Sequence, residues 1–393
     1  MRLLVLSFYY RPDLSAGSFR ATTLVEALRA CVTPATHIDV LTTLPNRYAT
    51  FTREAAQVEQ GPGWELRRIR LPRHRSDMSG QAWAFAHYAG GVLAHVAARP
   101  YDVVFATSSR LMTATLGAWI ARRKHARLYL DIRDIFVDTI KDVLPSSKAR
   151  AARMLFSHIE SWTVRRADRV NLVSPGFVEY FRERYPDLSL SSFTNGVDTE
   201  FLTAAPASSV DRESDGRVRI VYAGNIGDGQ ALHQILPHLA AALVTQARFI
   251  VIGDGGRRKE LEAALGQAGV TNVELRDPLS RDALIEVYRN AHVLFLHLGE
   301  LPAFERVLPS KLFEYAALGK PVLAGVAGCA ARFVREEISN AAVFTPGDVQ
   351  DALHAYATLE LVDRPREEFV TKYARAKIAD AMARDVLQLG YVA

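Results

Sequence analysis

FERVLPSKLFEYAALGKPVLAG, residues 304–325, contains a polar turn, an apolar-periodic helix and a short apolar strand in succession. The turn carries Pro309, Ser310 and Lys311, and the helical pattern that follows it ends at Gly319. A helix start attracts anions, so Lys311 can meet a phosphate there while Glu314 accepts hydrogen bonds from sugar hydroxyls. The ligand that combines these two groups is a nucleotide.

The same residues also fit a simpler interpretation. Acidic residues near a helix start favour the helix dipole, and a lysine there is commonly a solvated surface charge. Both interpretations stay open on these residues alone, and only the rest of the chain favours the first.

Short apolar strands alternate with helical segments along the whole chain of 393 residues, which predicts parallel α/β sheets. The pattern runs twice, and a stretch rich in Ser, Ala, Asp and Pro at 204–216 is the predicted linker between the two runs. Each run has a glycine-bearing loop after its first strand, with Gly17 in the first run and Gly224 in the second. We therefore predict two α/β domains, with a ligand in the cleft between them.

The composition excludes several classes of protein. Lys and Arg exceed Asp and Glu by only 48 to 43, so we expect no nucleic-acid partner, although an anionic ligand or lipid surface would suit the charge. Only Cys31 and Cys329 are present, which argues against a disulfide framework or a zinc cluster and fits a reducing cytoplasm. No secretory signal is recognisable, and the longest apolar stretch, Trp83 to Ala98, is too short to cross a bilayer.

A basic segment precedes that apolar stretch, with Arg67, Arg68, Arg70, Arg73, His74 and Arg75. The predicted helix over 81–98 carries aromatic residues such as Trp83, Phe85 and Tyr88. Basic residues beside an amphipathic aromatic helix are typical of a peripheral membrane contact. A solvated loop and an ordinary core helix explain the same residues.

Three segments in the correct order resemble the donor half of retaining GT-B glycosyltransferases of the group 1, or family four, type. These are Ala223-Gly224-Asn225-Ile226-Gly227, Ile252-Gly253-Asp254-Gly255, and the residues from Pro309 to Leu323. The loop from Tyr9 to Arg20, the segment from Asp131 to Phe136 and the turn 194–198 are similar to the family's amino-terminal half and interdomain turn. The family often builds bacterial surface polysaccharides.

The resemblance implies a GT-B fold, in which two Rossmann-like domains face each other across a cleft and a C-terminal helix crosses back to the first domain. Residues 1–195 would bind the acceptor, together with a helix at about 370–393, and residues 196–369 would bind the nucleotide sugar. The tail from Arg364 to Leu389 has the helical character that this arrangement needs.

The resemblance also implies functional residues. Lys311 and Glu314 would serve the leaving diphosphate and the ribose, and Asp134 would position the acceptor, although Asp134 also fits a strand-end cap or a pair with Arg133. Arg20, Arg133 and Asp134 would line the acceptor side. The implied donor-binding residues are Gly17, Gly224, Asn225, Gly227, Gly253, Asp254, Arg276, Leu279, Glu305, Ser310, Lys311, Leu312 and Glu314.

The chain departs from the family pattern at two places. Many relatives carry a second glutamate before the position of Glu314, but the matching position is Arg306, with Glu305 one place further away. Asn225 and Gln230 stand where many relatives have Arg and Lys. Similar Gly-Asn-x-Gly versions occur in enzymes that use N-acetylated hexosamine donors, so the resemblance favours a UDP-N-acetylhexosamine donor.

We expect a retaining, metal-independent hexosyltransferase without a cofactor, whose substrates are a nucleoside diphosphate sugar and a sugar or lipid-linked sugar acceptor. Its expected place is the cytoplasm, with peripheral contact at the inner membrane. Two alternatives remain: a nucleotide-sugar epimerase of similar two-domain shape, and a non-catalytic sugar-nucleotide-binding protein.

Overall fold

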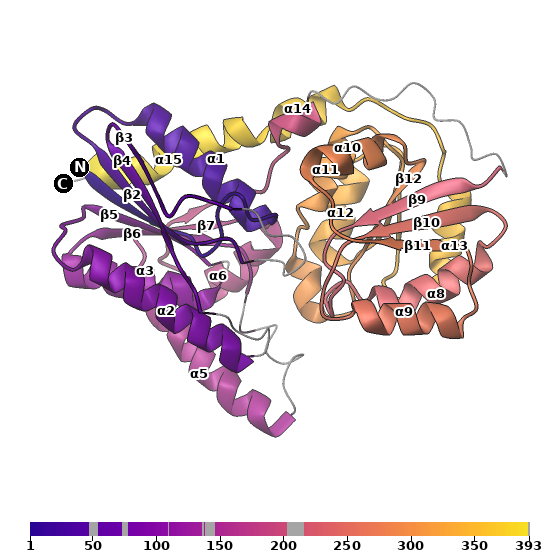
Figure 1. The fold of residues 1–393 in the computed structure, drawn as a ribbon, viewed down its shortest axis with the longest axis horizontal. Coiled ribbons are helices and arrows are strands. Elements are labelled where there is room, and N and C mark those ends of the chain that lie inside the picture. The colour runs from indigo at the N-terminus through magenta and orange to yellow at the C-terminus, as the bar shows by residue number, and fades with distance from the viewer. Residues whose placement is uncertain are drawn as a thin grey trace. The chain divides into compact units, whose positions relative to one another are not determined.

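The computed structural model describes residues 1–46, 54–72, 78–108, 110–135, 137, 146–202 and 216–391. The chain forms two compact units: Met1–Asn195 with Arg375–Ala393 make unit 1, and Gly196–Ala374 make unit 2. Each unit contains a sheet covered by helices on both faces (Figure 1). The predicted α/β class is confirmed. Of the predicted linker at 204–216, only Gly216 lies within the described residues.

The sheet of unit 1 has the strand order β3-β4-β2-β1-β5-β6-β7-β8. The strands are β1 (Arg2–Leu6), β2 (His37–Thr43), β3 (Val58–Gly61), β4 (Trp64–Ile69), β5 (Val103–Thr107), β6 (Arg127–Ile132), β7 (Arg169–Leu172) and β8 (Leu190–Ser191). All neighbours are parallel except β3, which forms an antiparallel hairpin with β4. The sequence did not predict β3, because this mostly exposed edge strand has little apolar character.

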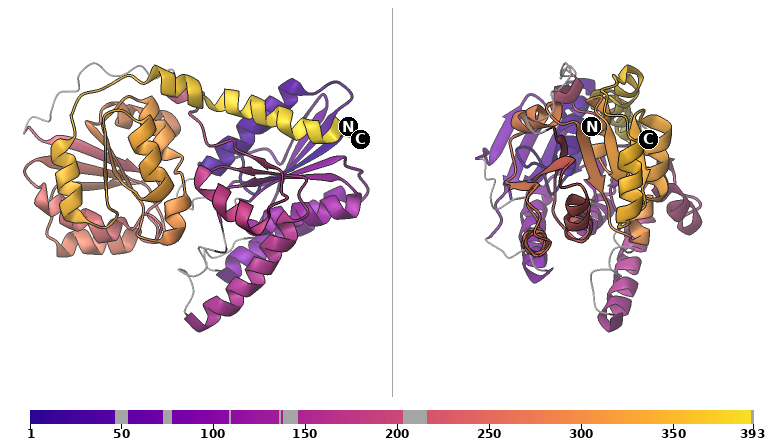
Figure 2. Two further views of the ribbon diagram at one scale, coloured as in Figure 1. Left: turned by 180° about the vertical axis from the view of Figure 1, so that it is seen from behind. Right: turned by 90° about the vertical axis from the view of Figure 1, so that its right-hand side faces the viewer.

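Helices cover both faces of this sheet because successive β1 side chains alternate in direction. Leu3 and Val5 belong to the core cluster formed with α1 (Ala16–Cys31) and α15 (Arg375–Tyr391). Leu6 points to the other face, where it lies near Gly117 of α3 (Leu111–Lys124). Figure 2 shows α15 alongside the sheet of unit 1. Among its described residues, unit 1 also contains the helices α2 (Met78–Val96), α5 (Ser146–Val164), η1 (Pro175–Phe177) and α6 (Val178–Arg184).

Unit 2 repeats the design with six parallel strands in the order β11-β10-β9-β12-β13-β14. They are β9 (Val218–Ala223), β10 (Ala247–Ile252), β11 (Val273–Arg276), β12 (Val293–His297), β13 (Val322–Gly325) and β14 (Ala341–Phe344). One face packs against α8 (Leu232–Ala242), α9 (Arg258–Gln267) and α13 (Val349–Thr358). The other packs against α7 (Thr199–Leu202), α10 (Arg281–Arg289), α11 (Lys311–Ala317), α12 (Gly328–Glu337) and α14 (Glu367–Tyr373).

The tail is helical, as predicted, and the C-terminal helix expected at about 370–393 corresponds to α15 (Arg375–Tyr391). A second, shorter helix, α14, precedes it, and the two separate at Ala374. Ala374 has φ −55° and ψ 118°, which is not helical, and it forms a bridge with Val197, whose N–H donates to the carbonyl of Tyr373 at 2.8 Å. Pairing with residue 197 therefore replaces the next helical turn. As a result α14 belongs to unit 2 and α15 to unit 1.

Candidate functional site

The candidate site of unit 2 lies where the strand order of its sheet reverses. The chain passes from β9 outward to β10 and β11 and then returns to β12 on the other side of β9. Open α/β sheets bind ligands at this switch point, outside the carboxyl ends of the two diverging strands. The loop that starts at Gly224 follows β9, while η2 (Pro302–Arg306) and α11 follow β12. Most predicted donor-binding residues therefore come from elements that start at this edge.

Two glycine loops interlock there. The N–H of Gly224 donates to the carbonyl of Ile252 at 2.8 Å, and the N–H of Ile226 donates to the carbonyl of Asp254 at 3.0 Å. Gly253 has φ 151°, and a Cβ on it would overlap the carbonyl oxygen of Gly224. Only glycine fits this close approach of two backbones. The loops after β9 and β10 thus form one rigid floor.

Lys311 begins α11 and reaches over this floor. Its Nζ lies 5.3 Å from the ring centroid of Tyr222, and a Cβ on Gly224 would overlap that Nζ. Tyr222 is fixed in turn, since its hydroxyl donates to the carbonyl of Asn225 at 2.6 Å. No carboxylate in the described part of the chain lies within ion-pair distance of the ammonium. Burial lowers the pKa of Lys311 and the charge of Glu314 opposes that shift.

Glu314 follows one turn later on α11 and is mostly buried. Its Oε1 lies 3.9 Å from Nη2 of Arg281, which also pairs with Asp198 of the turn at 194–198. Arg281 therefore ties that turn to the helix that carries Glu314. Arg281 was not predicted, because nothing in the sequence around it signals a contact with Asp198 or Glu314.

Three other predicted donor-binding residues, Asn225, Asp254 and Arg276, form hydrogen bonds or ion pairs with neighbouring residues. The amide nitrogen of Asn225 donates to Oε1 of Gln230 at 2.8 Å, and Oδ1 of Asp254 accepts from the N–H of Gly255 at 2.8 Å. Arg276 pairs with Glu274 through its side chain, and its carbonyl accepts from the N–H of Gly253.

The residues around α11 and η2 divide between core and surface. Leu312 lies fully in the core, Leu279 packs partly against the same core, and Ser310 accepts from the N–H of Phe313 through its carbonyl. Gly227 lies in the loop after β9, beside the side chain of Asn225. Glu305 is exposed at the end of η2, with its backbone against Gly328.

The structure places Arg20 inside unit 1, and the prediction that it lines the acceptor side is corrected. Arg20 is 5% exposed and forms a bidentate pair with Asp131, with both N···O distances at 2.9 Å. It also donates to the carbonyls of Phe193 and Thr194, each at 2.7 Å. Burial alone would raise the pKa of Asp131, but the charge and hydrogen bonds of Arg20 and a bond from Asn171 hold it below its ordinary value. Arg20 therefore stabilises the chain just before it leaves unit 1.

Two other predicted acceptor-side residues, Arg133 and Asp134, follow β6 at the carboxyl edge of the sheet of unit 1. Arg133 is half-buried and Asp134 is exposed. Gly17, which the resemblance implied as a donor-binding residue, is part of the first turn of α1 in unit 1. Phe136 lies outside the described residues.

The basic segment before α2 is partly neutralised. Arg67 pairs with Glu65, and the buried Arg68 pairs with Glu59. Arg73, His74 and Arg75 lie outside the described residues. On α2, Tyr88 is fully buried whereas Trp83 is 57% exposed. Within the ranges that the structure describes, no helix is long and apolar enough to cross a membrane.

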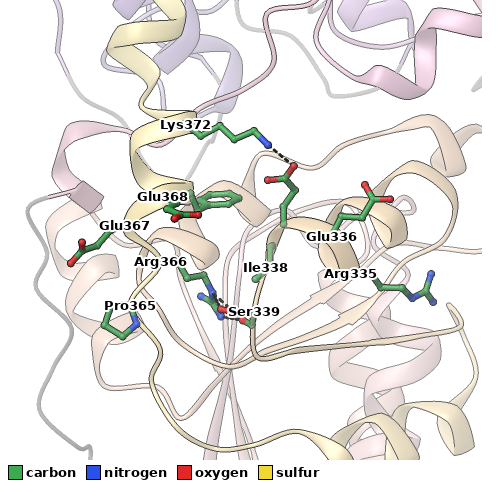
Figure 3. A pocket seen from close by; sticks show the side chains of 11 residues that line it. Arg335, Glu336, Ile338, Ser339, Pro365, Arg366, Glu367, Glu368 and Lys372 are labelled. Carbon is green, nitrogen blue, oxygen red and sulfur yellow. Dashed lines mark hydrogen bonds and ion pairs between the residues drawn. The ribbon is translucent and has the colours of Figure 1, made fainter.

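Unit 2 also has a pocket away from the glycine loops, between the end of α12 and the start of α14 (Figure 3). Its lining residues are Arg335, Glu336, Glu337, Ile338, Ser339, Pro365, Arg366, Glu367, Glu368, Phe369 and Lys372. Lys372 is bonded to Glu337 at 2.6 Å, and Arg366 donates to the carbonyls of Ala316 and Lys320, each at 3.0 Å. None of the predicted site residues lines this pocket.

One group in the described residues has the side chains of a metal site: Asp39, Glu65 and His95 in unit 1. Arg99 lies 3.3 Å from Asp39 and 3.4 Å from Glu65, and Arg2 pairs with Asp39 at 2.8 Å. The guanidinium groups already occupy the place of a cation, so this group is an ion-pair network of unit 1.

Two family models match the chain. Residues 17–188 match a glycosyl transferase 4-like domain, and residues 217–362 match glycosyl transferases group 1. WcaI of Escherichia coli (strain K12), which is named for colanic acid biosynthesis, is 25% identical over 214 residues, 51% of this chain and 51% of WcaI. The chain thus spans about half the length of the curated relative it matches.

Solved structures share the fold over the full chain. Sucrose-phosphate synthase from Thermosynechococcus elongatus aligns with a TM-score of 0.75 and 16% identity, covering 100% of both chains. Anabaena Alr3699/HepE in complex with UDP-glucose aligns with a TM-score of 0.63 and 17% identity, covering 100% of this chain and 97% of that protein. The two family models and this fold together show that the chain belongs to the GT-B glycosyltransferases of the group 1 type.

Proposed function

We propose that the protein is a glycosyltransferase that moves a sugar, with retention at the anomeric carbon, from a nucleoside diphosphate sugar to a sugar acceptor. Surface polysaccharide or glycoconjugate biosynthesis is the proposed setting, and the name of WcaI supports it. The observation that carries the proposal is the position of Lys311, whose ammonium lies over the Gly224 loop at the switch point without a carboxylate partner in the described ranges.

The chemistry explains why that position matters. Transfer of the sugar leaves negative charge on the diphosphate, and a fixed cation at that point lowers the barrier. Lys311 is held by the Tyr222 ring and the glycine floor, so it needs little rearrangement to meet the charge. In this proposal the lysine and the loop amides stabilise the leaving group without a metal, and Glu314 binds the ribose.

A UDP-N-acetylhexosamine is the proposed donor, on the basis of the Gly-Asn-x-Gly loop. The side chain of Asn225 is bonded to Gln230, so neither of these two neutral residues adds a cation next to Lys311. The complex of HepE with UDP-glucose supports a uridine nucleotide in a protein of this fold.

The proposed acceptor is lipid-linked, and the protein would act at the cytoplasmic face of the inner membrane. Exposed Trp83 on α2 is the described residue that supports a membrane contact. Flotation with anionic vesicles tests this point, and equal flotation of the wild type and Trp83→Ser would contradict the contact through α2.

The main experiment measures donor binding and transfer separately. UDP should bind to the wild type by calorimetry, and Lys311→Met should weaken both UDP binding and turnover. Lys259→Met on the surface of α9 is the matched control and should change neither. Turnover should persist with a chelator present. Wild-type turnover in Lys311→Met would refute the proposed role, and conversion of the donor to an isomer without acceptor would identify an epimerase instead.

A further inference from the structure

A buried histidine lies at the carboxyl end of β12, where the glycine loops of unit 2 meet. His297 is the last residue of β12 and is 1% exposed. Its imidazole is stacked with the rings of Phe295 and Phe344, with centroid distances of 6.4 Å and 6.0 Å. A polar ring in such apolar surroundings costs free energy unless its nitrogen atoms are hydrogen-bonded. The partners of these nitrogens therefore indicate what the side chain does.

Both ring nitrogens of His297 are bonded to the backbone. Nδ1 lies 2.7 Å from the carbonyl oxygen of Gln230, and the N–H of Gly347 donates to Nε2 at 3.0 Å. Because a carbonyl oxygen can only accept and a backbone N–H can only donate, Nδ1 carries the hydrogen and Nε2 is the acceptor. Burial lowers the pKa of His297, and the bond to Gln230 opposes that shift. The two partners thus select the neutral Nδ1–H tautomer, since an imidazolium could not accept from Gly347.

The bond from His297 fixes one peptide unit of the loop after β9. The carbonyl of Gln230 accepts from His297, and the N–H of Ala231 in the same peptide unit lies 3.2 Å from the carbonyls of both Gly227 and Asp228. Ala231 has φ 46°, in the left-handed region that is unfavourable for a residue with a Cβ. The turn from the loop into α8 therefore depends on hydrogen bonds that hold this peptide in place.

Other contacts connect the same peptide to the site. The N–H of Gly299, two residues after His297, donates to the carbonyl of Gly229 at 2.9 Å. The side-chain oxygen of Gln230 accepts from the amide of Asn225 at 2.8 Å. The other ring nitrogen reaches the loop after β14. His297 thus links two loops at the carboxyl edge of the sheet, and one of them is the glycine loop beneath Lys311.

We propose that His297 is a positioning residue for the nucleotide-sugar donor. Its neutral imidazole fixes the peptide after Gln230 and so keeps the loop from Gly224 to Ala231 in the shape that receives the diphosphate. The inference rests on the proposed function, in which the amides of this loop and Lys311 meet the leaving group. A loop that is already held in its binding shape loses less conformational entropy when the ligand binds.

Two substitutions separate this hydrogen bond from the packing of the ring. The amide of an asparagine reaches the position of Nδ1, so His297→Asn can still donate to the carbonyl of Gln230. The amide of a glutamine reaches the position of Nε2, so His297→Gln keeps an acceptor for Gly347 and loses the bond to Gln230. Both variants remove the ring from its stack with Phe295 and Phe344. A role in packing alone would therefore be lost in both.

Calorimetry of the full chain with UDP measures the effect on the donor site. His297→Gln should bind UDP roughly tenfold more weakly than the wild type, and His297→Asn should stay within about threefold of it. His238→Gln, at an exposed position of α8, is the matched control and should leave the affinity unchanged. Equal affinities of His297→Asn and His297→Gln for UDP would refute the proposal.

Hydrogen exchange followed by mass spectrometry reports on the loop without any ligand. Peptides that cover residues 224–231 should exchange roughly tenfold faster in His297→Gln than in His297→Asn, while α9 should exchange alike in both. If UDP does not bind to the wild type, the proposed function fails, and this comparison still decides whether His297 holds the loop. Equal exchange of residues 224–231 in the two variants would show that it does not.

Nitrogen-15 NMR of the histidine side chains tests the tautomer directly. The signal of His297, identified by its absence from His297→Asn, should show a protonated Nδ1 and an unprotonated Nε2. A hydrogen on Nε2 would overturn the assignment. Circular dichroism confirms folding of each variant. If His297→Gln does not fold, His297→Phe takes its place, because it keeps an aromatic ring in the stack and removes both hydrogen bonds, and it should show the same loss of UDP affinity.

Discussion

Replacing Gly224 with alanine tests whether the glycine loop positions the lysine. Gly224 has φ 148°, and a Cβ there would overlap Nζ and Cε of Lys311. The end of a lysine side chain moves more easily than a backbone, so the ammonium should leave its place while the loop stays folded. The unusual φ alone should lower the free energy of unfolding by about 1–3 kcal/mol.

The expected loss in affinity follows from the displacement. A unit charge about 4 Å from a phosphate contributes roughly 4 kcal/mol at an effective dielectric constant of about 20, and about half of that at 8 Å. A loss of about 2 kcal/mol corresponds to roughly 30-fold weaker binding of UDP. Calorimetry measures the affinity, and thermal unfolding measures the stability.

Two further variants make the test specific. In a Lys311→Met background, Gly224→Ala should have little additional effect on UDP binding, because the cation is already gone. Gly253→Ala should instead unfold or strongly destabilise unit 2, since its Cβ would overlap the backbone carbonyl of Gly224. Wild-type affinity in a folded Gly224→Ala, or fully additive effects with Lys311→Met, would refute the reasoning.

Three other predictions concern the buried charges. Arg20→Met should lower the free energy of unfolding in urea by about 3–5 kcal/mol, because Asp131 would remain buried without its partner. The control Arg29→Met, at an exposed position on the same helix, should lower it by less than about 1 kcal/mol. Equal losses in the two variants would contradict the structural role of Arg20. The pKa of Asp131 is lower in the folded than in the unfolded chain, so its stabilisation is complete above the ordinary carboxyl pKa of about 4 and is lost as the pH falls further. The free energy of unfolding of Asp131→Asn, measured in urea, should therefore fall less between pH 6 and pH 3 than that of the wild type. A steeper fall in the variant would argue against the lowered pKa of Asp131. Arg281→Met should weaken UDP binding roughly fivefold, because Glu314 would lose the charge that holds it in place. Pyrophosphate binding at the donor site of unit 2 should stay unchanged. Equal weakening of both ligands would show that Arg281 acts on the phosphates instead.

The sequence predicted the sheets well, because buried parallel strands are continuous apolar runs and alternate with amphipathic helices. The exposed hairpin strand Val58–Gly61 and the break at Ala374 could not be predicted in the same way. The first buries few side chains, and the second depends on a partner, Val197, that is distant along the chain.

The candidate site likewise contains some residues that the sequence predicted and others that it could not predict. Lys311 and the glycine loops were predicted because their residue types and local order carry the signal. Arg20 was misassigned, since a sequence does not reveal that a distant aspartate takes up its guanidinium.

The packing of α15 against α1 has a consequence for the order of events on the ribosome. Unit 1 contains the first residues of the chain, but its core also includes Met382, Ala383 and Val386, which follow all of unit 2. The second unit can therefore be complete while the first still exposes an apolar face to water. During synthesis, unit 1 can therefore complete its core only after unit 2 and the residues of α15 have been made.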